Sequence, residues 1–151
     1  MPRLLTEEMM KWVGRSDAPV HVEVTRREIV KYAIATEQRL EKYLAGDEAP
    51  PMFLFGLFRP LVPVDELGPD GLATSIVGPE LPLKRNMAGG VEVRQHRPIR
   101  PGDLLVGTRT LVDMYEKAGR QGPVIFMVYE LNVTTQAGEA VADEIQTRIA
   151  R

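Results

Sequence analysis

The 151-residue chain has a mass of 16.9 kDa, 44% hydrophobic and 26% charged residues, which are ordinary globular values and predict one domain over residues 1–151. A net charge of −2 without long lysine or arginine runs disfavours a nucleic-acid partner, and the absence of cysteine excludes disulfides and thiolate chemistry. Because no signal-peptide core and no apolar run of about eighteen residues is found, we expect a cytoplasmic protein with no membrane partner.

The first third of the chain predicts a short helix, a strand and a longer helix. Residues 6–13 begin with a threonine N-cap, carry apolar residues at helical spacing and end before Gly14. Residues 20–24 alternate with a period of two, as a half-buried strand does. Thr25 and Glu28 then match a capping box, in which each side chain accepts a hydrogen bond from the other residue's backbone amide. Apolar residues at helical spacing predict one amphipathic helix from there to Gly46.

The rest of the chain divides into an irregular apolar part and a strand-rich part. Between residues 50 and 82, prolines and glycines recur too often for a long helix or strand to persist. Residues 91–97, 104–116, 124–135 and 140–149 are β-type runs separated by turn residues, which predicts an antiparallel meander. The third run is apolar on both faces at its start, as a central strand is. This order predicts an α+β fold in which a curved sheet wraps helical and irregular apolar segments.

Two stretches of the sequence resemble a known family. Residues 82–90, Pro-Leu-Lys-Arg-Asn-Met-Ala-Gly-Gly, lead to a corner Arg97-Pro-Ile-Arg-Pro-Gly-Asp103, and residues 113–126 match the hairpin that follows in that family. The sequence thus resembles the N-terminal FAS1-like dehydratase domains of the MaoC-like hydratase/dehydratase superfamily. The resemblance implies a hot-dog fold, a curved antiparallel sheet wrapped around a helix. We therefore expect an α+β hot-dog domain whose helical or irregular segment is abbreviated before Pro50.

The resemblance also implies a reaction. Members of the superfamily act on acyl thioesters of coenzyme A or acyl carrier protein and work as pairs of hot-dog domains. Hydration of a 2-enoyl thioester needs a base to activate water, an acid for the α-carbon and a donor for the thioester oxygen. Catalytic members carry an Asp followed five residues later by a His, with an Asn-Pro between them. No aspartate in this chain is followed at that spacing by histidine, so we predict no catalytic residue in it.

Two segments are candidates for contact with an acyl ligand. The run from Met52 to Phe58 can line an apolar cavity, although an apolar cluster is as often plain core. The segment 86–90 can bring backbone amides close to a ligand, or it can be a bulge that opens a strand. The predicted substrate-binding residues are Met52, Phe53, Phe55, Asn86, Met87, Gly89 and Gly90.

The histidines are weaker candidates for chemistry. His21 and His96 lie in predicted strands, where a polar side chain most often faces solvent or a neighbouring group, and they lack metal-ligand spacing. No metal and no cofactor is expected. A base made of Asp47 or Glu48 with His96 would need residues that nothing in the sequence brings together.

These features predict a non-catalytic subunit of an enoyl-CoA hydratase or 3-hydroxyacyl-thioester dehydratase in lipid metabolism. Such a subunit would complete the acyl tunnel of a catalytic MaoC-like partner that carries the Asp/His motif, in a dimer or a dimer of heterodimers. The abbreviated segment predicts a wide cavity for bulky, steroid-like acyl chains. The alternative is a stand-alone homodimer that binds acyl-CoA without turnover.

Overall fold

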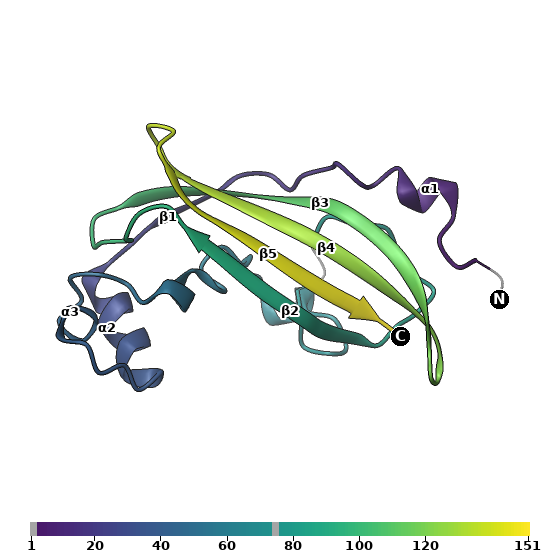
Figure 1. The fold of residues 1–151 in the computed structure, drawn as a ribbon, viewed down its shortest axis with the longest axis horizontal. Helices are drawn as coiled ribbons and strands as arrows, with labels where there is room; N and C mark the ends of the chain where they lie inside the picture. The colour runs from purple at the N-terminus through teal and green to yellow at the C-terminus, as the bar shows by residue number, and fades with distance from the viewer. Residues whose placement is uncertain (1–2, 74–75) are drawn as a thin grey trace.

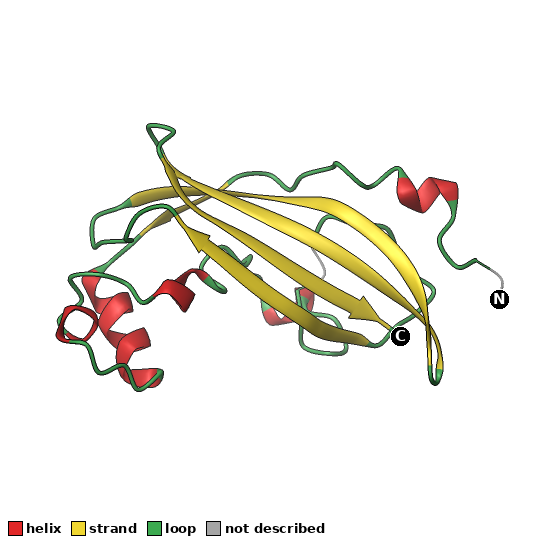
Figure 2. Ribbon diagram, in the orientation of Figure 1, coloured by secondary structure: helices red, strands yellow, loops and turns green. Residues whose placement is uncertain are grey.

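The computed structural model describes residues 3–73 and 76–151, and its centre is a five-stranded antiparallel sheet (Figures 1 and 2). The strands lie side by side in the order β1-β3-β4-β5-β2. This sheet, with few helices, confirms the α+β fold and the antiparallel strands predicted from the sequence. The strands are β1 (Val20–Glu23), β2 (Asn86–Gln95), β3 (Leu104–Gly119), β4 (Gly122–Thr135) and β5 (Ala140–Ala150).

The strand order corrects one part of the prediction. Strands β3, β4 and β5 form a meander through short turns, but β2 lies at the far edge and pairs with β5 instead of β3. Alternation of apolar residues specifies which face of a strand is buried, but it does not specify the neighbouring strand. The central position predicted for the third run is confirmed, because β4 pairs on both sides.

One face of the sheet carries most of the core, and we call it the inner face. On β4 its residues are Ile125, Met127, Tyr129, Leu131 and Val133, and all five are buried. Two core clusters lie on this face. The first joins Leu131 and Val133 to Ile29, Phe53 and Phe58, whereas the second joins Ile125 and Met127 to Leu5, Val77 and Leu81. Segments far apart in the sequence therefore cover the two halves of one sheet.

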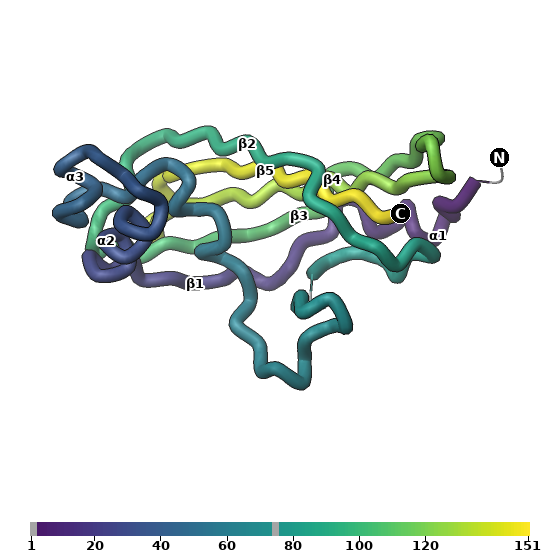
Figure 3. The backbone as a smooth tube through the Cα atoms, turned by 90° about the horizontal axis from the view of Figure 1, so that it is seen from below, coloured from purple at the N-terminus to yellow at the C-terminus, as the bar shows by residue number. Residues whose placement is uncertain are grey.

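The helices α2 (Arg26–Ala35) and α3 (Glu41–Leu44) lie together at one end of the sheet (Figures 1 and 3). The capping box is confirmed, since the Thr25 hydroxyl accepts from the Glu28 amide and the Glu28 carboxylate accepts from the Thr25 amide. The prediction of a single long helix up to Gly46 is wrong. Helix α2 ends at Ala35, with Thr36 as its C-cap, because Glu37 has a φ of 55°, in the left-handed region that terminates helices.

The remaining elements are short. Helix α1 (Glu7–Met10) begins at the Thr6 cap, as predicted. Between residues 50 and 82 the chain forms only the 3₁₀ turns η1 (Pro51–Leu54) and η2 (Val64–Glu66) within its described part. The segment between η1 and β2 extends away from the sheet before it returns (Figure 3). The prediction that long regular elements cannot persist there is confirmed, since prolines interrupt backbone pairing.

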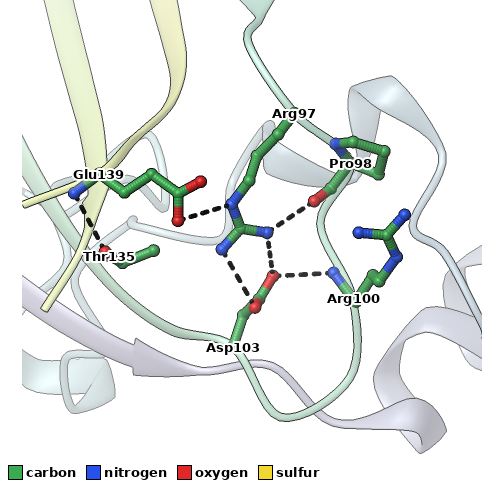
Figure 4. A network of polar contacts seen from close by, with 6 residues as sticks. All are labelled: Arg97, Pro98, Arg100, Asp103, Thr135 and Glu139. Atoms are coloured by element: carbon green, nitrogen blue, oxygen red, sulfur yellow. Dashed lines mark hydrogen bonds and ion pairs between the residues drawn. The ribbon is translucent and has the colours of Figure 1, made fainter. Parts of the chain in front are cut away.

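A bidentate ion pair holds the corner between β2 and β3 (Figure 4). The Arg97 guanidinium donates to both Asp103 carboxylate oxygens, at 3.0 and 3.2 Å, and one of its nitrogens also donates to the Pro98 carbonyl at 2.8 Å. The Arg100 amide donates to the same carboxylate at 2.9 Å, and the Arg97 Nε lies 3.5 Å from Glu139 Oε2. Both partners of the pair are mostly buried, with 20% and 18% of their side chains exposed. The corner identified in the sequence is thus closed by a contact between its first and last residues.

We expect Asp103→Asn to lower the free energy of unfolding by about 1–3 kcal/mol, because it removes the charge and one acceptor from a mostly buried ion pair. Urea denaturation of the purified chain measures the change. The matched control is Glu80→Gln, which breaks the exposed pair between Glu80 and Lys84 and should leave the unfolding midpoint in place. Equal midpoints for Asp103→Asn and the parent would show that the corner does not depend on the ion pair.

Candidate functional site

The first group of predicted binding residues surrounds η1. Phe53 is 6% exposed and belongs to the first core cluster, where its ring packs edge-on against Tyr32 with centroids 5.6 Å apart. Met52 and Phe55 are each 40% exposed. The Arg59 guanidinium lies 4.8 Å from the centre of the Phe55 ring. This group therefore contains one core residue and two residues that a ligand or a partner can reach.

The second group lies on the exposed edge strand β2. The pairing with β5 is irregular between Ala88 and Gly90, which matches the bulge considered from the sequence. A Cβ added to Gly89 would lie 3.0 Å from side-chain carbons of Thr147 and Ile149, so this glycine permits the close approach of the two strands. The structure places the two groups on separate elements, and their role in binding stays a prediction.

Two hollows on the inner face share a wall. The loop hollow has a volume of about 580 Å³ and the sheet hollow about 540 Å³. Both are bounded by Leu72, Ile76 and Arg148. The loop hollow adds Arg59, Leu61 and Val62, whereas the sheet hollow adds Asn86, Met127 and Tyr129. Asn86 is thus a predicted binding residue that lines a hollow. Together the two hollows form an elongated space that is apolar beside the loop and more polar beside the sheet.

Charged side chains lie on the inner face near these hollows. Glu144 on β5 is only 3% exposed, and its Oε2 has no hydrogen-bond partner among the described residues. Burial raises the pKa of the Glu144 carboxyl, while the positive charges of Arg109 and Arg59 oppose this shift. Burial also lowers the pKa of Arg148, which lies over the Tyr129 ring at 5.9 Å. Within residues 3–73 and 76–151, no carboxylate lies within 4 Å of Arg109 or Arg148.

Sequence reasoning missed this inner-face cluster. A period of two along β5 puts Glu144, Gln146 and Arg148 on the same face as the buried Ala142 and Ala150. The alternation itself was therefore the available signal. Buried charges are costly unless they are paired, and they concentrate where a protein binds or transforms a ligand.

Asp17 fixes the segment that borders these hollows. Its carboxylate accepts a hydrogen bond from the Val77 amide at 3.0 Å, and its own amide donates to the Arg109 carbonyl at 2.8 Å. Burial raises the pKa of the Asp17 carboxyl, and the Val77 amide and Arg109 oppose that shift. Through Asp17, these two hydrogen bonds connect the segment that contains Val77 to β3.

The histidines lie away from the hollows. His96 Nε2 is 2.7 Å from Asp143 Oδ2, and this contact, together with the amide of Asn132, lowers the pKa of Asp143. Asp143 and Asn132 alternate with buried inner-face residues, so this group lies on the opposite, outer face. His21 is exposed on β1. A neighbouring carboxylate, that of Asp143, is therefore the hydrogen-bond partner of the His96 ring.

The two acids that could act with His96, Asp47 and Glu48, form ion pairs with other residues. Asp47 accepts from Arg26, and Glu48 accepts from Lys42 at 2.9 Å. No base made of His96 with either acid is assembled. Across the part of the chain that the structure describes, no group of three or more His, Asp or Glu residues could hold a metal ion. Nor do the described residues include a helix that is long and apolar enough to cross a membrane.

Comparison with known proteins gives consistent results. Residues 11–144 match the family model described as "FAS1-like, dehydratase domain region". The chain is 26% identical over 121 residues to the mesaconyl-C(4)-CoA hydratase of Chloroflexus aurantiacus, an alignment that covers 80% of this chain and 43% of that protein. The chain thus spans less than half the length of this curated relative.

Solved structures show the same fold. A MaoC-like dehydratase from Phytophthora capsici superimposes with a TM-score of 0.74 at 18% identity, over 97% of this chain and 50% of that one. The ChsH1–ChsH2 complex from Mycobacterium tuberculosis gives a TM-score of 0.69 at 16% identity, over 96% of both chains. This likeness confirms the predicted hot-dog fold.

We expect Glu144→Gln to stabilise the protein at neutral pH, because it removes a carboxyl whose pKa burial has raised. A raised pKa favours the neutral form in the folded state, so the contribution of Glu144 to stability is full below its unfolded pKa of about 4.3 and is lost as the pH rises through the folded value. The thermal midpoint of the variant should therefore exceed that of the parent at pH 7 and converge with it near pH 4. Glu92→Gln, at a carboxylate that is 70% exposed, is the control. A variant less stable than the parent at pH 7 would contradict this interpretation.

Proposed function

Because the chain belongs to the FAS1-like dehydratase family within the MaoC-like superfamily, we propose that it is a non-catalytic subunit of an enoyl-CoA hydratase or 3-hydroxyacyl-thioester dehydratase. The positions of the two histidines carry this proposal. His21 is exposed on an edge strand and His96 is bonded to Asp143 on the outer face, whereas the hollows lie on the inner face. A hydratase needs its acid and base beside the bound thioester. The chemistry therefore comes from a partner that carries the Asp/His motif.

The edge strand β2 supports pairing with such a partner. In the sheet β2 bonds only to β5, and nine of its ten residues are exposed, including Met87 and Val91. An unpaired edge presents backbone amides and carbonyls that a strand of another chain can extend. The ChsH1–ChsH2 complex, which has the same fold, is an assembly of two different proteins. We propose that β2 faces the catalytic hot-dog partner in a dimer or a dimer of heterodimers.

The limited helical cover of the inner face supports a wide acyl cavity. Helix α2 has ten residues and packs with the first core cluster, whereas irregular chain borders the loop and sheet hollows. Trp12 does not line these hollows but packs against the second core cluster. The subunit would therefore complete a tunnel for a branched or polycyclic acyl group, such as a steroid-like side chain. This role places it in lipid metabolism, and the cysteine-free chain fits the cytoplasm.

We expect hydratase activity only when the chain is combined with a MaoC-like partner that carries the Asp/His motif. In that complex His96→Ala should change kcat by less than about twofold, because truncating a group outside the chemistry does not raise the barrier. His21→Ala is the matched control. Enoyl-CoA hydration is followed for the chain alone, the partner alone and the mixture. Turnover by the chain alone, or a loss of several orders of magnitude in kcat with His96→Ala, would contradict the non-catalytic assignment. A homodimer that binds acyl-CoA and never turns over with any such partner would support the alternative.

We expect the complex to prefer bulky substrates, because a cavity limited by volume discriminates through transition-state binding. The measurement compares kcat/KM for a branched or polycyclic enoyl-CoA with that for linear C4 and C8 enoyl-CoA. The expected preference for the bulky substrate is at least about tenfold. A preference for the linear substrates would reject the wide cavity and leave the subunit assignment in place.

A further inference from the structure

We propose that a basic hollow at the β3–β4 hairpin binds the phosphate groups of coenzyme A, so that CoA and not a carrier protein presents the acyl group to this subunit. This inference rests on the proposed function. The hairpin hollow has a volume of about 630 Å³ and lies between the chain that enters β2 and the hairpin turn. Its wall includes Leu83, Lys84, Arg85, Arg120, Val124 and Arg151.

The hairpin hollow concentrates positive charge in a chain whose net charge is −2. Four of its lining residues are cationic, and they come from three separate segments of the chain. Lys84 is paired with Glu80 at 2.9 Å, on the exposed surface. Among the residues that the structure describes, Arg85, Arg120 and Arg151 have no carboxylate within 4 Å. These three guanidinium groups are therefore available to an anionic ligand.

The backbone at these arginines is held beside the hollow. The Arg85 amide donates to the Arg151 carbonyl at 3.0 Å, and the Arg151 amide donates to the Arg85 carbonyl at 2.9 Å. Arg120 stands in the turn between Gly119 and Gly122, where a Cβ on Gly119 would lie 2.8 Å from the Gly122 carbonyl oxygen. The tight turn therefore requires glycine and holds Arg120 beside the hollow. Guanidinium groups bind phosphate oxygens in pairs of parallel hydrogen bonds.

The hairpin hollow continues the elongated space on the inner face. It shares Leu83 and Lys84 with the sheet hollow, which in turn shares Leu72, Ile76 and Arg148 with the loop hollow. Met127 pairs with Arg148 and lies five residues beyond Gly122 on β4, so the hairpin is about 17 Å from that register position. The order of chemistry along this course is apolar, mixed and then cationic. An acyl-CoA has the same order in its acyl chain, its pantetheine arm and its phosphorylated nucleotide.

The shape of the site favours a nucleotide over a carrier protein. A concave space of several hundred cubic ångströms suits a small ligand that is enclosed by its site. An acidic carrier protein would instead need a broad and flat basic surface on this chain. Four cationic side chains line this one hollow, so its expected ligand is the compact group of phosphates on CoA.

Calorimetric titration of the purified chain with CoA, 3′-dephospho-CoA and pantetheine tests this site. We expect CoA to bind more tightly than 3′-dephospho-CoA and pantetheine to bind weakly, with an affinity for CoA that falls as salt rises. Arg120→Gln and Arg151→Gln should each raise the Kd for CoA about tenfold and leave the Kd for pantetheine unchanged. Arg39→Gln, at an exposed arginine between α2 and α3, is the control. Arg120→Lys should restore part of the affinity. Thermal midpoints equal to that of the parent show that the variants are folded.

Failure of the site is distinct from failure of the proposed function. Absence of CoA binding, or an unchanged Kd in the double variant Arg120→Gln/Arg151→Gln, overturns the site. Binding of an acyl carrier protein that these variants weaken, with CoA binding unaffected, also overturns it. An active complex whose kcat/KM for enoyl-CoA does not change with the double variant rejects this inference and keeps the proposed function. CoA binding that depends on the arginines, without turnover alongside any catalytic partner, rejects the proposed function and keeps the site.

Discussion

The ion pair between Arg97 and Asp103 closes the corner at which β2, β3 and the chain entering α2 meet. After β2 the chain must pass from one edge of the sheet to the strand beside β1, and this corner makes the passage. The same corner holds the start of the helical end, because the Val24 amide donates to the Asp103 carbonyl and the Gly102 amide donates to the Val24 carbonyl. One mostly buried contact between charged groups thus connects the crossing between the sheet edges to the entry into α2.

The two halves of the inner face of the sheet differ in what covers them. Near α2 that face is covered by aliphatic and aromatic side chains, and the core there is continuous. Toward the hairpin the cover is irregular chain, and Arg148 and Tyr129 line the sheet hollow. Glu144, opposite Leu131 of the first core cluster, is buried without a partner for one of its oxygens. A buried polar group without a hydrogen-bond partner lowers stability, so the second oxygen of Glu144 is a cost to the fold. The proposed acyl tunnel and the proposed phosphate site both lie on this second half.

The sequence determined the features that depend on neighbours in the chain. A threonine and a glutamate three residues apart determine the start of α2. Glycines favour the turns between β3 and β4 and between β4 and β5, and alternation of apolar residues indicates the positions of these strands. The absence of an Asp and His at catalytic spacing is likewise a property of the sequence alone. These features could be predicted because each depends on contacts within a few residues or on a repeat along one element.

Only the tertiary structure decided which elements meet. The left-handed Glu37 divides the predicted helix, and the edge position of β2 follows from pairing with β5, which alternation does not encode. Of the predicted binding residues, Phe53 is placed in the core and Asn86 beside a hollow, although both stand in apolar or small-residue runs. The four cations of the hairpin hollow come from three segments that lie far apart in the sequence, so no local pattern could assemble them. Their grouping depends on strand register and chain crossing, whose free energies come from contacts between distant residues.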